Sequence, residues 1–455
     1  MTNRSPAFLF GTKNFQILKY VLILFTGWRL VILFIAYFGL SIFPFHQSPG
    51  QLDWANQSTD FWIRWANWDG GHFRGIAENG YINPFQVVFF PLYPLTIKIL
   101  SLTGLPSLWG GLIISNLSLI GALFFLYKLV LFEGQENTAK KAILATLAFP
   151  TAFYLGSVYS ESLFLFLAVA SFYFARKKLW LIALMLAGLA SVTRLIGLAV
   201  ILSIGLEYFL TTTRPPSIRE YWSSPLARVF TYIFSAVVLT KLVAAFATGL
   251  DAYLLLGLLK SILDPLFLIG LILLILFAGK FLLDRFNFPK LLTRQVFYFL
   301  PALTPFLIYC LFLNISQGDP LAFIHHEQQW HRHLSFPWTA PVDYFNRLGP
   351  GGFFQLGSPA QAVIELVFFL IFFALFILSY FKLRISYTVF FAAALFIPIS
   401  TGTLQAIHRY GLVIFPALIL LARIKNEEAF NLWIYFSLML QGLLLVLFFN
   451  GYWVT

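Results

Sequence analysis

The sequence predicts an all-α, polytopic integral membrane protein. Sixty per cent of its 455 residues are hydrophobic, only 11% are charged, and the mean hydropathy is +0.82. A soluble protein of this length needs more charge than this to cover its surface. Apolar runs of about 15 to 25 residues recur along the whole chain, and a helix that spans a bilayer needs about 20.

The distribution of Lys and Arg predicts how the chain threads the membrane. Basic residues collect in cytoplasmic loops, which explains the net charge of +12 without a nucleic-acid partner. Placing the basic clusters inside, among them Arg176/Lys177/Lys178 and Lys382/Arg384, gives about thirteen spans, with the N-terminus inside and the C-terminus outside. The expected spans are 20–42, 107–130, 142–158, 161–175, 179–193, 195–210, 228–248, 255–279, 296–314, 360–381, 386–400, 410–422 and 430–450.

One apolar segment, residues 85–103, would break this alternation if it crossed the membrane. Pro91 and Pro94 each remove a helix hydrogen bond, which also argues against a regular span. We therefore expect a helix that lies at the outer interface or dips into the membrane from outside, with its broken backbone covered by protein.

The threading leaves two long outer loops, residues 43–106 and 314–359, in a single domain of residues 1–455. Core helices at 107–210 connect them. No cleavable secretory signal is expected at the N-terminus. The lone cysteine, Cys310, excludes intramolecular disulfides and cysteine-based metal sites.

The densest polar constellation is WANWDGGHFRGIAENGY, residues 65–81. On an interfacial helix, Asp69, His72 and Phe73 would share one face. An interfacial aromatic belt would explain the tryptophans alone. It does not explain Trp68-Asp69-Gly-Gly, in which a carboxylate stands beside backbone that a neighbouring group can approach closely. Asp69 is therefore the centre of the candidate site.

Several charged residues are expected at other outer turns. Arg194 in SVTRLIG and Arg409 in AIHRYG could extend to the interface as membrane-anchoring side chains. The functional alternative is that their guanidinium groups bind a phosphate. Glu161 could cap the following helix, or it could be a second acid of the site.

The run HHEQQWHRH, residues 325–333, suggests a metal site at first sight. His325, Gln329 and His333 would align on a helix, but the spacing matches no familiar zinc motif. We favour a polar helix that recognises the headgroup or sugar of a substrate.

Five ordered segments together resemble a known family. WDGGHFRGIAENGY with FFPLYP, FPTAFYLGSVYSESLF, ASVTRLIG, GDPLAFIHHEQQWHRHLSFPW and HRYGLVIFPAL are similar, in this order, to segments of the PIG-V mannosyltransferases, which add the second mannose in GPI-anchor assembly. The resemblance covers residues 65 to 420. It implies a GT-C glycosyltransferase fold, a polyprenyl-phosphate sugar donor, and a catalytic carboxylate in the first outer loop, which is Asp69 here.

The resemblance also implies roles for the other candidates. Asp69 would act as base in an inverting transfer of mannose, and Arg194 and then Arg409 would stabilise the leaving phosphate. The expected donor-binding set also contains His408, Glu161 and Tyr159. Trp68, His72, Gln329, Trp330 and Arg332 would line the acceptor pocket. No cofactor is expected, because Gly-Gly follows Asp69 and a tight acidic pair is absent. A divalent metal stays an open alternative.

Two other functions remain as alternatives: a polar-lipid transporter or flippase, and a non-catalytic subunit of a glycosylation complex. A transporter should place polar residues near mid-span in repeated halves, whereas here they concentrate at one face. We expect a lipid or glycolipid acceptor, surrounding membrane lipids, and a prokaryotic plasma membrane with the site outside. A small membrane subunit stays open as a further partner.

Overall fold

The computed structural model describes residues 12–44, 60–212, 288–330, 332–346, 359–452 and 454. The chain divides into two compact units, one of residues 1–208 with 300–455 and one of residues 209–299. Most of the second unit lies outside the described residues, as do the expected spans 228–248 and 255–279 and residue 331 of the histidine run. The single-domain assignment stays a prediction.

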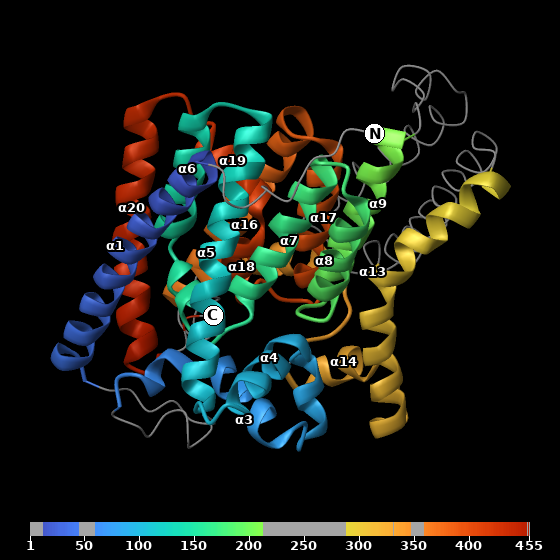
Figure 1. The fold of residues 1–455 in the computed structure, drawn as a ribbon. Helices are drawn as coiled ribbons and strands as arrows, with labels where there is room; N and C mark the ends of the chain where they lie inside the picture. The colour runs from blue at the N-terminus through green and yellow to red at the C-terminus, as the bar shows by residue number, and fades with distance from the viewer. Residues whose placement is uncertain are drawn as a thin grey trace, which may run out of the picture. The chain divides into compact units, whose positions relative to one another are not determined.

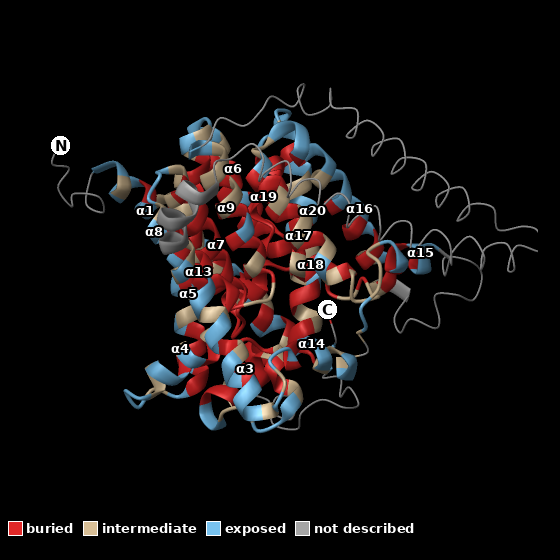
Figure 2. Cartoon of the chain, turned by 90° about the vertical axis from the view of Figure 1, so that its right-hand side faces the viewer, coloured by how far each residue is buried: buried red, intermediate tan, exposed pale blue. Residues whose placement is uncertain are grey.

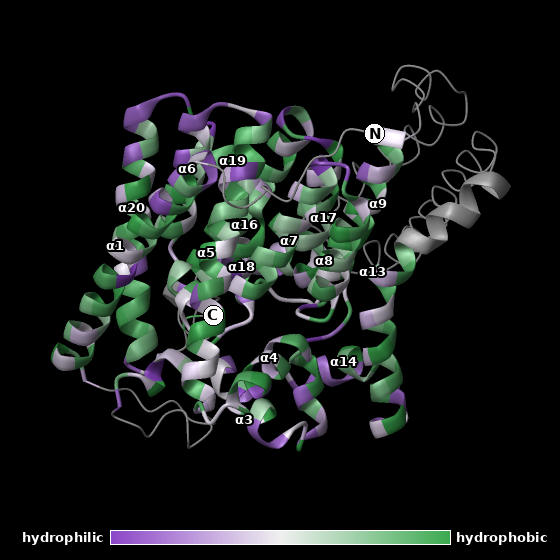
Figure 3. Ribbon diagram, in the orientation of Figure 1, coloured by the Kyte–Doolittle hydropathy of each residue, from purple (hydrophilic) through white to green (hydrophobic). Residues whose placement is uncertain are grey.

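The described part of the chain is helical, with no strand, which confirms the all-α part of the predicted fold class; the GT-C fold and the thirteen spans stay predictions. Five helices are long and apolar enough to cross a membrane, at residues 12–42, 107–133, 299–317, 361–382 and 427–449. Figure 3 shows hydrophobic residues along these helices and hydrophilic residues at their connections. The protein is an integral membrane protein.

The longest helices follow the predicted spans closely. They are α1 (Thr12–Ile42), α5 (Ser107–Glu133), α13 (Phe288–Gln317), α16 (Pro359–Lys382) and α20 (Glu427–Phe449). Shorter helices pack between them, as the buried residues of the bundle show in Figure 2. They are α7 (Glu161–Arg176), α8 (Trp180–Ser191), α9 (Gly197–Thr212) and α17 (Ile385–Ile399).

Two predicted spans are wrong in their bounds. The span at 142–158 is a shorter helix, α6 (Glu136–Ala148), followed by the 3-10 helix η3 (Ala152–Gly156), because Pro150 interrupts the hydrogen bonding. The span at 410–422 is α19 (Phe415–Ala422), preceded by α18 (Ile407–Tyr410) and η6 (Gly411–Val413). Pro416 fits only the first turn of α19.

The segment at 85–103 is broken, as its prolines indicate. It forms η2 (Pro84–Val88) and α4 (Leu92–Ser101), and ten helical residues extend only about 15 Å. Residue 92 donates a backbone hydrogen bond to the carbonyl of Val192, 2.9 Å away, which ties this segment to the end of α8. Protein therefore covers part of the broken backbone, as expected.

Ion pairs join helix ends at one end of the bundle. Arg176 lies 3.4 Å and Arg384 2.8 Å from Oε1 of the buried Glu207. Arg176 also binds Glu133, at 2.9 Å. The predicted cytoplasmic clusters that contain Arg176 and Arg384 therefore lie at the same end of the bundle.

A cap of short elements covers the other end. It contains η1 (Ile63–Ala66), α3 (Asp69–Asn79) and α14 (Ala322–His325), and Figure 1 shows α3, α4 and α14 gathered there, where α1 and α20 both finish. Carbonyls of α20 fix η1: Arg64 Nη1 donates to Phe449, 3.1 Å away, and Asn67 Nδ2 to Phe448, 2.9 Å away.

Arg29, in the middle of α1, contacts a residue of this cap, Trp65. Its guanidinium lies 4.1 Å from the centre of the Trp65 ring, and Trp65 is fully buried. A cation over an indole face is stabilised by the ring quadrupole. The contact joins a membrane helix to the segment that precedes Asp69.

Candidate active site

Asp69 is the first residue of α3, and its position is fixed by the backbone on both sides. The preceding residue, Trp68, has φ 59° and ψ −119°, a conformation that is rare for a residue with a side chain. Such strain costs on the order of 1–3 kcal/mol and tends to cluster at functional sites. The following residue, Gly70, lets α3 approach the chain at Val158 and Tyr159.

The approach at Gly70 is too close for a side chain. A Cβ on Gly70 would lie 3.0 Å from the carbonyl oxygen of Val158 and 3.5 Å from the Tyr159 ring. Two hydrogen bonds strengthen this junction, from Val158 N to Trp65 O at 2.9 Å and from Tyr159 Oη to Asn67 O at 2.7 Å. Glycine is therefore required here by the fold, and the group that approaches it is the protein's own residue 158–159 segment.

Four of the predicted residues form one chain of ion pairs. Arg409 Nη1 lies 2.7 Å from Asp69 Oδ2, and Arg409 Nε lies 3.4 Å from Glu161 Oε1. Arg194 Nη1 lies 2.8 Å from the same oxygen of Glu161. Glu161 is 1% exposed and Asp69 17% exposed, so Asp69 is the more accessible of the two carboxylates.

These charges set the protonation state of Asp69. Burial by itself would raise the pKa of the Asp69 carboxyl, but Arg409, His72 and Arg194 together hold that pKa below its usual value. Burial lowers the pKa of His72, and the charge of Asp69 opposes this only in part. At neutral pH the site therefore contains a charged Asp69 beside a neutral His72.

Tyr410 is a site residue that the sequence reasoning missed. The guanidinium groups of Arg194, Arg332 and Arg409 lie 5.6, 5.7 and 5.6 Å from the centre of its ring. Tyr410 directly follows Arg409 in the matched segment, but nothing local in the sequence shows that two further arginines approach it. Three cations around one ring repel one another, so the place favours negative charge, part of which Asp69 and Glu161 supply.

Glu327 was also missed, since it was considered only as part of the histidine run. Its carboxylate lies 3.6 Å from Arg332. Burial raises the pKa of Glu327, the nearby Arg332 lowers it, and the negative charge of Asp69 raises it further. Glu327 therefore belongs to the same electrostatic cluster as Asp69.

One member of the predicted acceptor set, Trp330, contacts His72. The His72 ring stacks on Phe89, with centroids 4.6 Å apart, and meets the edge of Trp330 at 5.7 Å. Arg332 lies over the ring of Tyr410. Gln329 is exposed, and Trp68 is half-buried at the start of α3.

His408 does not point to Asp69. Its Nε2 donates to the carbonyl of Val454, 2.6 Å away, and its ring packs on Phe368. Burial lowers the pKa of His408 to about 4, so it is neutral. The geometry indicates a residue that supports α18, and the donor-binding role expected for it has no support in this arrangement.

The expected alignment of His325, Gln329 and His333 on one helix is wrong. The helix α14 ends at His325, η4 (His326–Trp330) follows, and residues 332–336 are not helical. His325 binds Asp319 instead, with 2.5 Å between Nδ1 and Oδ2. Within the described residues, no three His, Cys, Asp or Glu side chains gather as metal ligands. Whether the reaction needs a metal stays a prediction.

The fold and the site define a class: an integral membrane protein with a buried, charged cluster at one end of its helix bundle. Comparison with known sequences narrows this class. Residues 14–214 match the family of mannosyltransferases of the PIG-V type, so the predicted resemblance is confirmed over this part of the chain. The matched part contains Asp69, Glu161 and Arg194.

One curated relative agrees with this family. The human GPI alpha-1,6-mannosyltransferase 2 is 32% identical over 135 residues. That match spans 27% of the present chain and 27% of the human protein. No solved structure matches the chain.

Proposed function

We propose that the protein is a membrane mannosyltransferase that moves a mannose from a polyprenyl-phosphate donor to a lipid-linked acceptor with inversion. The main support is the ion pair between Asp69 and Arg409, which places a carboxylate beside a group of arginines in a buried cluster. The family match over residues 14–214 supports the sugar and the reaction class.

In this mechanism Asp69 is the base. Arg409 binds Oδ2 of Asp69, so Oδ1 is the oxygen that accepts the proton of the acceptor hydroxyl. As that proton leaves, the acceptor oxygen attacks C1 of the sugar and the bond from C1 to the phosphate oxygen breaks. One displacement inverts the configuration at C1. Such base catalysis typically contributes about 10²–10⁴-fold in rate.

The leaving group is a polyprenyl phosphate, and the arginines around Tyr410 would receive it. Arg194 and Arg409 supply guanidinium groups that suit a phosphate, and Arg332 completes the cluster. Two buried donors there, Trp330 Nε1 and Arg332 Nε, have no hydrogen-bond partner among the described residues. A buried polar group without a partner costs about 1–3 kcal/mol, so a ligand that supplies one is favoured.

The wider setting of the proposal is a GT-C fold with about thirteen spans and the site on the extracytoplasmic side of a prokaryotic plasma membrane. It is supported by the separation of the ionic clusters at the two ends of the bundle, one around Glu207 and one around Glu161. The positive-inside rule assigns the Glu207 end to the cytoplasm. No metal takes part in the proposed reaction.

The proposal is tested by transfer from radiolabelled polyprenyl-phosphate mannose to an added lipid acceptor pool in membranes that contain the full chain. Asp69→Asn should lower transfer by at least 100-fold, as expected for loss of a general base. Asp60→Asn, in the same loop, is the matched control and should keep transfer, because an amide oxygen can still accept from the backbone of Trp62 and Ile63. Wild-type transfer by Asp69→Asn would contradict the assignment, and transfer from GDP-mannose alone would contradict the donor class.

A further inference from the structure

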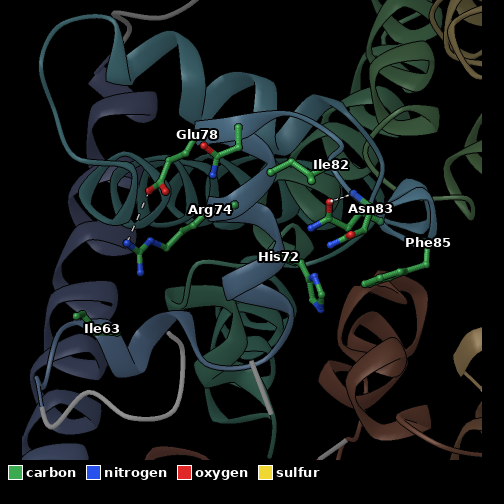
Figure 4. A pocket seen from close by; sticks show the side chains of 10 residues that line it. Ile63, His72, Arg74, Glu78, Ile82, Asn83 and Phe85 are labelled. Atoms are coloured by element: carbon green, nitrogen blue, oxygen red, sulfur yellow. Dashed lines mark hydrogen bonds and ion pairs between the residues drawn. The ribbon is translucent and has the colours of Figure 1, made fainter. Parts of the chain in front are cut away.

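A cavity lies beside α3. Its volume is about 370 Å³, within the range of about 300–1,000 Å³ typical of ligand pockets. Its lining combines charged, amide and apolar side chains from α3 and η2, namely His72, Arg74, Glu78, Asn79, Ile82, Asn83, Phe85 and Gln86, with Ile63 and Gly75. Figure 4 shows Arg74 and Glu78 side by side at one end, and Phe85 directed toward His72 at the other.

Helix geometry places this cavity close to Asp69. His72 follows Asp69 by three residues, and Gly75 and Asn79 continue the same stripe of α3. The rise from Asp69 to His72 is about 4.5 Å. His72 is therefore a wall that the Asp69 site and the cavity have in common.

The cavity offers hydrogen bonds without net charge. Arg74 and Glu78 form an ion pair at 3.8 Å, and the hydroxyl of Ser107 contacts both side chains. His72 is neutral, and Asn79, Asn83 and Gln86 are uncharged. A phosphate would need surplus positive charge, which the lining lacks.

The rings at the His72 end add an apolar face. Phe85 meets His72 edge-on, with ring centroids 6.0 Å apart. The centroid of the Trp330 ring lies 5.7 Å from that of His72 and 6.2 Å from that of Phe85. A sugar ring presents hydroxyl groups around its edge and C–H groups on its faces. Paired carboxylate and guanidinium groups suit the hydroxyls, and an aromatic face suits the C–H groups.

We propose that this cavity binds an uncharged hexose unit of the acceptor, and that it delivers the acceptor hydroxyl past His72 to Asp69. The inference rests on the proposed function, because it names the class of acceptor that the same site receives. It divides the site into an arginine side for the phosphate of the donor and a neutral side for the glycan of the acceptor.

Binding is measured first, without any transfer reaction. Methyl α-mannoside is titrated into the purified full chain in detergent and followed by ligand-observed NMR, with mannose 6-phosphate as the charged comparison. The neutral sugar should bind more tightly than the phosphorylated one. Glu78→Gln should raise its Kd about tenfold, as expected for the loss of a charged hydrogen bond. Ile82→Trp should block binding by filling the cavity, and it is expected to fold, since Ile82 is 68% exposed.

The matched control is Glu136→Gln. Glu136 also pairs with a basic residue one turn away, Lys140 at 2.8 Å, but it lies on α6 and does not line the cavity. The Kd of the Glu136→Gln variant for methyl α-mannoside should equal that of the wild type. Equal or tighter binding of mannose 6-phosphate, or a Kd unchanged by both Glu78→Gln and Ile82→Trp, would overturn the proposal.

Transfer kinetics then assign the cavity to the acceptor. Glu78→Gln should raise the KM for the acceptor about tenfold and leave the KM for the donor unchanged. A rise in donor KM alone would place the donor sugar here and overturn the inference. The two proposals fail separately: sugar binding without any transfer would contradict the proposed function, while transfer without cavity-dependent binding would contradict only the acceptor site.

Discussion

Arg194 and Arg409 bind the same oxygen of Glu161, at 2.8 and 3.4 Å. Glu161 is the first residue of α7, Arg194 follows α8, and Arg409 lies in α18. One buried carboxylate thus holds two cations that would otherwise repel each other, and only Arg409 continues to Asp69. Glu161 is in this view a positioning residue: it acts through the arginines.

Replacing Glu161 with Gln should destabilise the fold. Removing one partner of a buried ion pair typically costs about 3–5 kcal/mol, because the remaining charges stay buried. Thermal unfolding of the purified protein in detergent should therefore show a clearly lowered Tm, and Glu161→Asp should recover part of it. The exposed pair of Glu136 provides the control, since Glu136→Gln should hardly change the Tm. Equal Tm values for Glu161→Gln and the wild type would show that Glu161 does not hold the arginines.

Arg409→Gln should shift the pH dependence of transfer. Arg409 lowers the pKa of Asp69, so the ion pair stabilises the fold above the unfolded carboxyl pKa of about 3.9, and this contribution is lost as the pH falls through the lower folded pKa. Without Arg409 the pKa of Asp69 rises. The acidic limb of kcat/KM against pH should therefore move to higher pH, and Arg409→Lys should move it less. An acidic limb at the same pH in all three proteins would contradict the role of Arg409.

Gly70→Ala should disturb the start of α3. The added Cβ would lie 3.0 Å from Val158 O and 3.3 Å from the Ala66 side chain, and neither backbone can move freely. We expect a loss of about 1–3 kcal/mol in stability and a marked fall in transfer, because Asp69 moves with the helix. Gly27→Ala is the control, since nothing lies within 4 Å of a Cβ there. Transfer by Gly70→Ala at the wild-type rate would show that the tight junction is not needed.

Chelation should leave transfer unchanged. In the proposed reaction the positive charge beside the leaving phosphate comes from Arg194, Arg332 and Arg409 around Tyr410. Transfer is measured in membranes washed with EDTA, with and without added Mg²⁺ or Mn²⁺. Loss of transfer in EDTA with recovery on adding Mn²⁺ would contradict the metal-free proposal.

Much of the architecture could be predicted from charge and hydropathy alone. The alternation of basic clusters predicted that Arg176 and Arg384 share one end of the bundle, and that Asp69, Glu161, Arg194 and Arg409 share the other. Both predictions are confirmed. Arg176 and Arg384 bind Glu207, and ion pairs connect Asp69, Arg409, Glu161 and Arg194. The rule works because it concerns whole helices, whose ends are separated by the thickness of the membrane.

Finer features of the site depend on contacts that no local pattern contains. Tyr410 lies among three arginines from three separate segments, and Glu327 joins Asp69 from the second outer loop. His408 was placed in the donor-binding set with its matched segment, and its contacts with Val454 and Phe368 depend on chain segments distant in sequence. The helix predicted through the histidine run is wrong because a 3-10 helix, η4, follows α14, and residues 332–336, which include His333, are not helical.

The hydrogen bonds from the cap to α20 set an order of events during biosynthesis. Arg64 and Asn67 donate to carbonyl groups that lie 385 and 381 residues later in the chain. Contacts between residues so far apart in sequence form slowly, because a long loop must close first. The segment that holds Asp69 therefore emerges early from the ribosome but reaches its final position only after α20 has entered the membrane. Until then the Asp69 segment lacks these two hydrogen bonds, so the site can form only once both the first and the last membrane helices are in place.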